Sequence, residues 1–139
     1  MSEQQNFEYY QSKTDEELDV LVAEAAGLKL AYLSNEGGWL DSNGVLVHLK
    51  SEFHPTSKTN YAIELLREVA AEGNGVAINT ADIITQANAI TIGGFPFSSG
   101  VELPLITNPV DDINSFGDFR KTFLRSICIF YILYKNSRE

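Results

Sequence analysis

The sequence predicts an α+β fold in which a small antiparallel sheet packs with about three helices. Two stretches, 14–26 and 53–75, carry apolar residues at helical spacing, and short β-branched segments lie between and after them. A third stretch, from Phe119 onward, is apolar on almost every side of a helical wheel. With 139 residues, 44% of them hydrophobic, the chain is large enough for one core. A single domain over 1–139 is therefore expected, with 1–13 loosely ordered.

The first predicted helix covers residues 14–26. It opens with the capping box "TDEE", in which the Thr14 hydroxyl suits the amide of the third helical residue and the Glu17 side chain suits the Thr14 amide. Apolar residues then follow at helical spacing, namely Leu18, Leu21, Val22, Ala25 and Ala26. Gly27 is the residue type that commonly ends a helix, so the helix is expected to stop there.

Two strands are predicted next, "LKLAYL" at 28–33 and "GVLVHL" at 44–49, and we expect them to pair. The sequences "NEGG" at 35–38 and "DSNG" at 41–44 are typical of turns. A second helix follows and ends near Gly73. The sequence does not determine where this helix starts, because four residues suit an N-cap and Pro55 disfavours helix at the residue before it. The four are Thr56, Ser57, Thr59 and Asn60.

Three β-branched segments complete the predicted sheet, and a long loop follows them. The segments are "GVAINT", "DIITQAN" and "AITIGGF", at 75–80, 82–88 and 89–95. Residues 95–112 hold three of the four prolines, which predicts an ordered, irregular loop of the kind that often shapes a binding site.

Charge and composition exclude several classes of protein. The formal net charge is −9, which disfavours general binding of nucleic acid, because its phosphates would be repelled. The longest apolar run, at 127–134, is much shorter than the ~20 residues of a membrane span. The first residues lack the basic and apolar parts of a signal peptide. The one cysteine, Cys128, lies in an apolar run, so the chain is expected in a reducing cytoplasm, with a buried and protonated thiol.

The predicted C-terminal helix differs from the rest of the chain in charge. Residues 1–118 carry 18 acidic and 5 basic residues, whereas 119–139 carry 1 acidic and 5 basic residues. Because a single small domain has little capacity to surround an apolar helix, one side of it is expected to contact a second copy. Lys121 and Arg125 are four residues apart, with Arg120 nearby, near the helix N-terminus where anions are favoured. An anion site is one interpretation; a solvated face, or pairing with Asp111, Asp112 and Asp118, is the other.

No catalytic or metal-binding pattern accompanies these cations. His48 falls in a predicted strand and His54 precedes a proline, without the spacing of a metal site or a catalytic triad, so both are expected to be structural. Phe95 and Phe97 flank Pro96 in the predicted loop. A ring held on a loop can stack on a base, although an anchor in a core or interface is the other interpretation. No metal and no cofactor are expected.

Three segments, "EELDVLVAEAAGLK", "FHPTSKTNYAIELL" and "FLRSICIFYILYK", resemble the NinX-like phage family over roughly residues 14–135. That family includes the first-described Thoeris anti-defence proteins, which bind and sequester cyclic ADP-ribose isomers made by bacterial TIR-domain enzymes. Some members are dimers or hexamers assembled from dimers, and the hexamers have additional sites for cyclic di- or trinucleotides. The resemblance therefore implies a homo-oligomeric, non-enzymatic sponge for a cyclic nucleotide, located in the cytoplasm of the infected bacterium.

Carried over to this sequence, the resemblance implies that Arg125 and Lys121 bind the pyrophosphate. Lysine cannot form the two-pronged contact of arginine, so Arg120 is the alternative second cation. An aromatic residue and an asparagine near the nucleoside correspond to Phe95 and Asn108, and Phe97 competes with Phe95. Replacement of Arg125 by Ala is expected to abolish binding and to leave assembly intact.

Two other functions stay open. The acidic surface suits a phage inhibitor that binds a basic host protein or mimics DNA. An enzyme that cleaves a nucleotide is the third possibility, which conversion of the ligand would reveal.

Overall fold

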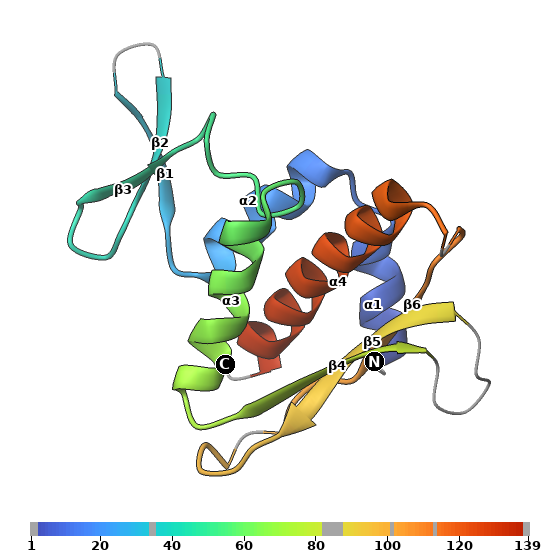
Figure 1. Cartoon of the computed structure of the whole chain (residues 1–139). Helices are drawn as coiled ribbons and strands as arrows, with labels where there is room; N and C mark the ends of the chain where they lie inside the picture. The colour runs from blue at the N-terminus through green and yellow to red at the C-terminus, as the bar shows by residue number, and fades with distance from the viewer. Residues whose placement is uncertain (1–2, 34–35, 82–87, 101, 113, 138–139) are drawn as a thin grey trace.

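The computed structural model describes residues 3–33, 36–81, 88–100, 102–112 and 114–137. The fold class is α+β, as predicted: these residues form four helices and two antiparallel three-stranded sheets (Figure 1). Helix α4 lies at the centre of the molecule, in contact with α1, α2 and α3 and with the second sheet (Figure 1). The first sheet projects away from the helices (Figure 1).

Helix α2, Asp15–Ala25, begins with the predicted capping box. The Glu17 amide donates to Thr14 Oγ1 at 3.2 Å, and the Thr14 amide donates to Glu17 Oε1 at 3.0 Å. Gly27 has a φ of 83°, the left-handed conformation expected after a helix end. Before it, Glu3–Gln11 form helix α1, in a stretch for which the sequence predicts only loose order. Phe7 of α1 is buried in the core and gives this short helix an apolar contact.

The first sheet corrects the predicted strand pairing. It consists of β1 (Lys29–Leu33), β2 (Glu36–Leu40) and β3 (Leu46–Leu49) in the order β1-β2-β3. The predicted direct pairing of 28–33 with 44–49 is therefore wrong, because β2 lies between them. The predicted turn at 35–38 is wrong for its last three residues, which belong to β2, and its first residue, Asn35, lies outside the described residues. A Cβ on Gly37 would lie 3.3 Å from Leu30 Cδ1 and 3.4 Å from Lys50 Cβ, so glycine lets neighbouring side chains close over this strand.

Helix α3, Thr59–Ala71, has Lys58 at its N-cap position, and this side chain makes no capping hydrogen bond. None of the four capping candidates occupies that position. The end agrees with the prediction, since Gly73 has a φ of 93°. The second sheet follows, with β4 (Gly75–Ala81), β5 (Asn88–Phe95) and β6 (Ile106–Pro109) in the order β4-β5-β6.

The second sheet overlaps one predicted strand and one predicted loop. The predicted strand at 82–88 lies outside the described residues, except for Asn88, which begins β5. Strand β6 falls inside 95–112, the stretch predicted to be a loop throughout. It pairs with β5 from Ala89↔Pro109 to Ile92↔Ile106, and Pro109 occupies the strand end, where a missing amide is tolerated.

Helix α4, Phe116–Ser137, is the centre of the core. It begins three residues before the predicted Phe119, and every residue from Leu124 to Tyr134 is buried. It contacts α1, α2, α3, β5 and β6. The premise that so small a domain could not surround this helix is wrong, so its apolar character no longer argues for a second copy. None of the described helices, α4 included, combines the length and the apolar character that a membrane crossing requires.

Candidate functional site

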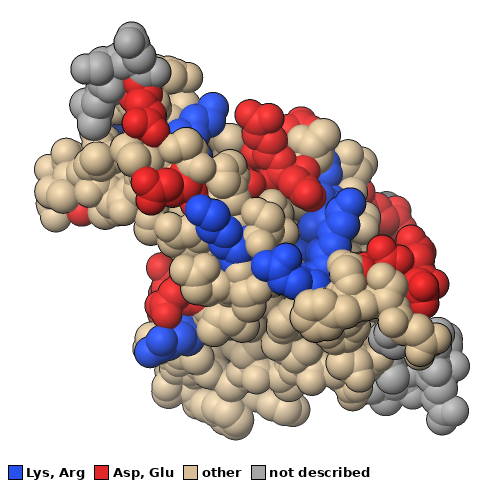
Figure 2. Space-filling view, turned by 45° about the horizontal axis from the view of Figure 1, so that its top comes forward, with Lys and Arg blue, Asp and Glu red and all other residues tan. Residues whose placement is uncertain are grey.

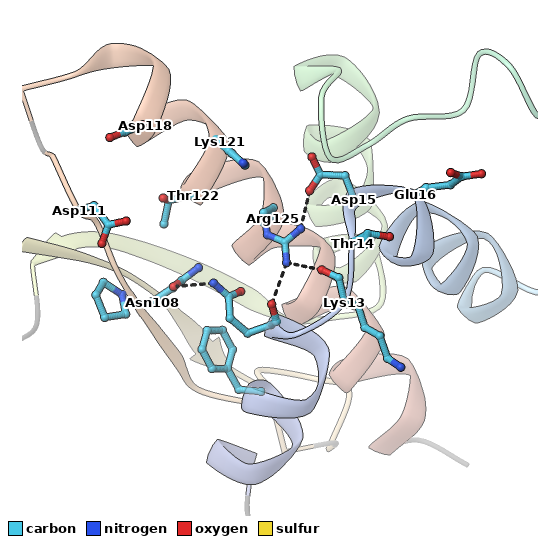
Figure 3. A pocket seen from close by; sticks show the side chains of 13 residues that line it. Lys13, Thr14, Asp15, Glu16, Asn108, Asp111, Asp118, Lys121, Thr122 and Arg125 are labelled. Carbon is cyan, nitrogen blue, oxygen red and sulfur yellow. Dashed lines mark hydrogen bonds and ion pairs between the residues drawn. The ribbon is translucent and has the colours of Figure 1, made fainter.

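A pocket of about 920 Å³ lies between α1, the start of α2, the end of β6 and the first half of α4 (Figure 3). We call it the α1–α4 pocket. Its volume lies within the roughly 300–1,000 Å³ range of small-molecule sites. Arg125, Lys121 and Asn108, three of the five residues that the resemblance implies, line it.

Arg125 is buried and internally bonded. Its Nη2 donates to the main-chain oxygens of Gln11 at 3.1 Å and Lys13 at 2.9 Å. Its Nη1 forms an ion pair with the Asp15 carboxylate (Figure 3). The guanidinium therefore fastens α4 to the turn between α1 and α2. This is a structural function in addition to any function in ligand binding.

Asn108 belongs to a second polar connection between the same elements. Its Oδ1 accepts a hydrogen bond from Gln11 Nε2 at 3.4 Å, and its Nδ2 donates to Ser126 Oγ at 3.0 Å. Ser126 Oγ in turn donates to the Thr122 carbonyl at 2.6 Å. Because Asn108 is almost fully buried, these bonds satisfy an amide that would otherwise be costly to bury. The side chain joins α1, β6 and α4.

Lys121 is the most accessible cation of the pocket. It lies on the exposed surface of α4, one turn before Arg125. Among the described residues, no ion pair within 4.0 Å involves Lys121. Lys13 contributes its carbonyl to the bond with Arg125, whereas its ammonium lies 4.5 Å from the centroid of the Tyr9 ring and points away from the pocket (Figure 3). Lys121 is thus the cation best placed to meet an anion entering from solvent.

The remaining two predicted residues lie elsewhere. Arg120 donates to the Ser57 carbonyl at 2.7 Å and to Thr59 Oγ1 at 3.3 Å, so it contacts the start of α3. Phe95 lies at the end of β5, is 67% exposed, and stacks on Phe97 with ring centroids 6.0 Å apart. Neither Arg120 nor Phe95 is among the residues that line the α1–α4 pocket.

Several residues of the pocket are absent from the sequence-based prediction. Phe7 supplies an aromatic side chain to its lining, and Gln11 and Thr122 add polar groups. Four acidic residues also line it, Asp15, Glu16, Asp111 and Asp118. For Asp15 and Glu16 the capping box at Thr14 indicates only a helix start, whereas Asp111 and Asp118 are acids that the sequence suggests as alternative partners of the basic residues. Contacts between Arg125 and residues more than 100 positions earlier cannot be found from local patterns.

The electrostatic character of the pocket is mixed. Four acids and three basic residues line it, but the ammonium of one of the three, Lys13, points away, which leaves Lys121 and Arg125 as its cations. Figure 2 shows the same mixture on one face of the molecule, where Lys and Arg side chains lie between groups of Asp and Glu. An anionic ligand would therefore need to engage specific cations, because the general field of the pocket does not favour it.

The histidines and the cysteine have structural surroundings. The His48 ring lies 4.8 Å from the ring of Phe53, and burial lowers the pKa of His48. His54 contacts the buried Asp19 carboxylate at 3.1 Å. Burial raises the pKa of Cys128 well above its ordinary value, as expected for a protonated thiol. In the described ranges, no group of three or more His, Cys, Asp and Glu residues is arranged to hold a metal ion.

Comparison with known proteins adds no relative: no protein-family model, curated protein or solved structure matches this chain.

Proposed function

We propose that this chain is a phage anti-defence sponge, which binds a cyclic nucleotide of the cyclic ADP-ribose type and sequesters it without converting it. The observation that carries the proposal is the meeting of Lys121, Arg125 and Asn108 in one pocket of ligand size. These are residues that the resemblance to the NinX-like phage family implies for binding. The site proposed is the α1–α4 pocket.

The proposal gives each of these side chains a separate task. Lys121 binds the pyrophosphate from the solvent side, as a mobile point charge. Arg125 binds it from the floor of the pocket, where main-chain oxygens fix the guanidinium. Asn108 stays within its hydrogen-bonded network and keeps β6 and α4 in place around the ligand. No aromatic contact for the base is assigned, because Phe95 lies outside the pocket and the Phe7 ring, although it belongs to the lining, is buried in the core.

The test mixes the purified protein with a cyclic ADP-ribose isomer made by a TIR-domain enzyme and follows binding by calorimetry. The complex is then denatured by heat, and the released ligand is chromatographed. Tight binding with recovery of intact ligand supports the sponge. Recovery of an altered ligand would indicate an enzyme instead, and no heat of binding would reject the proposed ligand.

The assembly is part of the same proposal and rests on the resemblance. We propose a homo-oligomer, either a dimer or a hexamer built from dimers. Light scattering coupled to size-exclusion chromatography measures the mass directly. A mass equal to the 15.4 kDa of one chain at micromolar concentration would reject it.

A second candidate function is favoured by the exposed pair of Phe95 and Phe97. These rings are 67% and 78% exposed, and aromatic side chains displayed in this way are typical anchors of protein interfaces. Together with the acidic composition, they suit an inhibitor that binds a basic host protein. Co-purification of one host protein with the wild type, and its loss from a Phe97→Ser variant, would favour this candidate over the sponge.

A further inference from the structure

The bonds of Arg125 fall into two groups. Among the residues that the structure describes, Nη2 donates to two main-chain oxygens, those of Gln11 and Lys13, which fix the guanidinium without the help of a side chain. Nη1 instead pairs with a side chain, the carboxylate of Asp15. The main-chain bonds fix the position of the guanidinium, and the bond to Asp15 is the one that a rotation of a side chain can break.

Asp15 is also placed where an incoming ligand would meet it. It is the first residue of α2, its side chain is 48% exposed, and it lines the α1–α4 pocket (Figure 3). The Arg125 side chain is only 10% exposed, and its Nη1 is paired with this carboxylate. A carboxylate and a phosphate make the same kind of charge-assisted bond to a guanidinium. The Asp15 carboxylate and a phosphate group of a ligand therefore cannot both occupy the Nη1 edge of the Arg125 guanidinium.

We propose that Asp15 is an internal competitor for the anionic ligand, which occupies the edge of Arg125 that a phosphate group must take. This inference rests on the proposed function in one respect, namely that the α1–α4 pocket is the anion site. Binding then requires exchange: the Asp15 carboxylate turns toward solvent as a phosphate oxygen replaces it on Nη1. Because the exchange costs one ion pair, a ligand with one charged group gains little. A pyrophosphate can contact both Arg125 and Lys121, so the site selects against ligands that carry a single phosphate group.

The test compares two variants that remove the same charge from the same pocket. Asp15→Asn keeps an oxygen that accepts from Nη1 and so preserves the connection between α2 and α4, but a neutral amide is a weaker competitor. Glu16→Gln is the matched control, since Glu16 lines the pocket and, within the part of the chain that the structure describes, forms no ion pair with Arg125. The probes are inorganic pyrophosphate and inorganic phosphate, titrated by calorimetry at an ionic strength of about 0.15 M, where exposed charges are screened.

Asp15→Asn is expected to bind pyrophosphate about tenfold more tightly than the wild type, because the ligand no longer has to displace a charged competitor from Nη1. Glu16→Gln is expected to change the affinity by no more than about twofold, because exposed charges are screened. The preference for pyrophosphate over phosphate is expected to fall in Asp15→Asn. Equal affinities of Asp15→Asn and Glu16→Gln, or no binding by either, would overturn the inference.

A folding control keeps the result interpretable. Thermal unfolding of Asp15→Asn is measured first, and if the variant is not folded, Asp15→Ser replaces it, with the same expected increase in affinity. A separate titration of the wild type with the cyclic ADP-ribose isomer tests the proposed function. If the wild type binds that nucleotide but Asp15→Asn does not bind pyrophosphate more tightly, the inference about Asp15 is wrong and the proposed function stands. If Asp15→Asn binds pyrophosphate more tightly but the wild type does not bind the nucleotide, the proposed function is wrong and the inference about Asp15 stands.

Discussion

His54 contacts Asp19 through one ring nitrogen and a main-chain carbonyl through the other. Nδ1 lies 3.1 Å from Asp19 Oδ2, and Nε2 lies 3.0 Å from the Ser51 oxygen. A carbonyl can only accept, so Nε2 must carry a proton. A further proton must then lie between Nδ1 and the carboxylate, on one of the two groups. This shared proton joins α2 to the segment that leads from the first sheet to α3.

Replacing Asp19 separates its hydrogen bonds from its charge. Asp19→Asn keeps an oxygen for the Thr56 amide, which donates to Asp19 Oδ1 at 3.0 Å, and offers an N–H to a neutral His54. Its free energy of unfolding is expected to change by less than about 1 kcal/mol at neutral pH. Asp19→Ala leaves both partners unpaired and should lose about 2 kcal/mol. Urea denaturation measures both, and equal losses in the two variants would contradict this account.

The same carboxyl predicts a pH dependence of stability. Burial raises the pKa of Asp19 from 3.8, against the opposing effect of its hydrogen bonds from Thr56 and His54. The folded chain therefore keeps this proton to a higher pH than the unfolded chain does. The resulting stabilisation is present below pH 3.8 and is lost as the pH rises through the raised pKa of the folded state. Urea denaturation across this range should show the stability of the wild type falling relative to Asp19→Asn; parallel curves would contradict it.

Lys121 offers the cleanest test of the proposed anion site. Lys121→Gln removes an exposed charge and should leave the free energy of unfolding unchanged. It should weaken binding of the cyclic nucleotide about tenfold, by loss of one charge-assisted contact. Lys29→Gln, an exposed lysine of β1, is the matched control and should bind as the wild type does. Calorimetry measures the affinity of the wild type and of both variants for the nucleotide. An equal loss of affinity in the two variants would indicate a general effect of charge and would contradict a specific contact of Lys121.

Arg125→Ala is expected to destabilise the protein as well as to weaken binding. The change leaves two main-chain oxygens and a carboxylate without the buried cation that they share, at a cost of about 3 kcal/mol. Arg67→Ala is a suitable control, since its ion pair with Glu64 is largely exposed and should contribute almost nothing. Thermal unfolding measures both. A fully stable Arg125→Ala variant would show that the internal bonds of Arg125 are dispensable.

Cys128 should be inert in the folded protein. The side chain is completely buried in α4, and burial raises the pKa of its thiol, so little reactive thiolate is present. Its labelling by a thiol reagent should occur only at the rate at which the core opens, and denaturant should make labelling fast. Because the sequence holds one cysteine, the signal is unambiguous. Rapid labelling under native conditions would contradict the burial of α4.

Elements with local signals could be predicted from the sequence. The capping box at Thr14 and the glycine after the helix define α2 within a few residues, because the atoms involved lie within one turn of the chain. Strand β2 could not be predicted, for the opposite reason. Its two glycines favour turns on their own, and the side chains of Leu30 and Lys50 that crowd Gly37 cannot be inferred from the local sequence.

The candidate site could be predicted only in part, for a related reason. The spacing of Lys121 and Arg125 on one helix puts both in the same pocket, since it follows from helix geometry. The partner of each charge depends on distant residues: Arg120 turns to the start of α3, and Arg125 to Asp15 and the carbonyls of the α1–α2 turn. Local sequence carries no information about such partners.

The central position of α4 also bears on how the protein is made. The ribosome synthesises residues 1–115 before this helix, and α1, α2, α3 and the second sheet then lack the apolar surface on which they pack. The nascent chain can form α2 by local interactions but has no core to complete. Folding is therefore expected to wait until α4 has left the exit tunnel, and until then the exposed apolar faces of the earlier elements are substrates for chaperones that bind nascent chains.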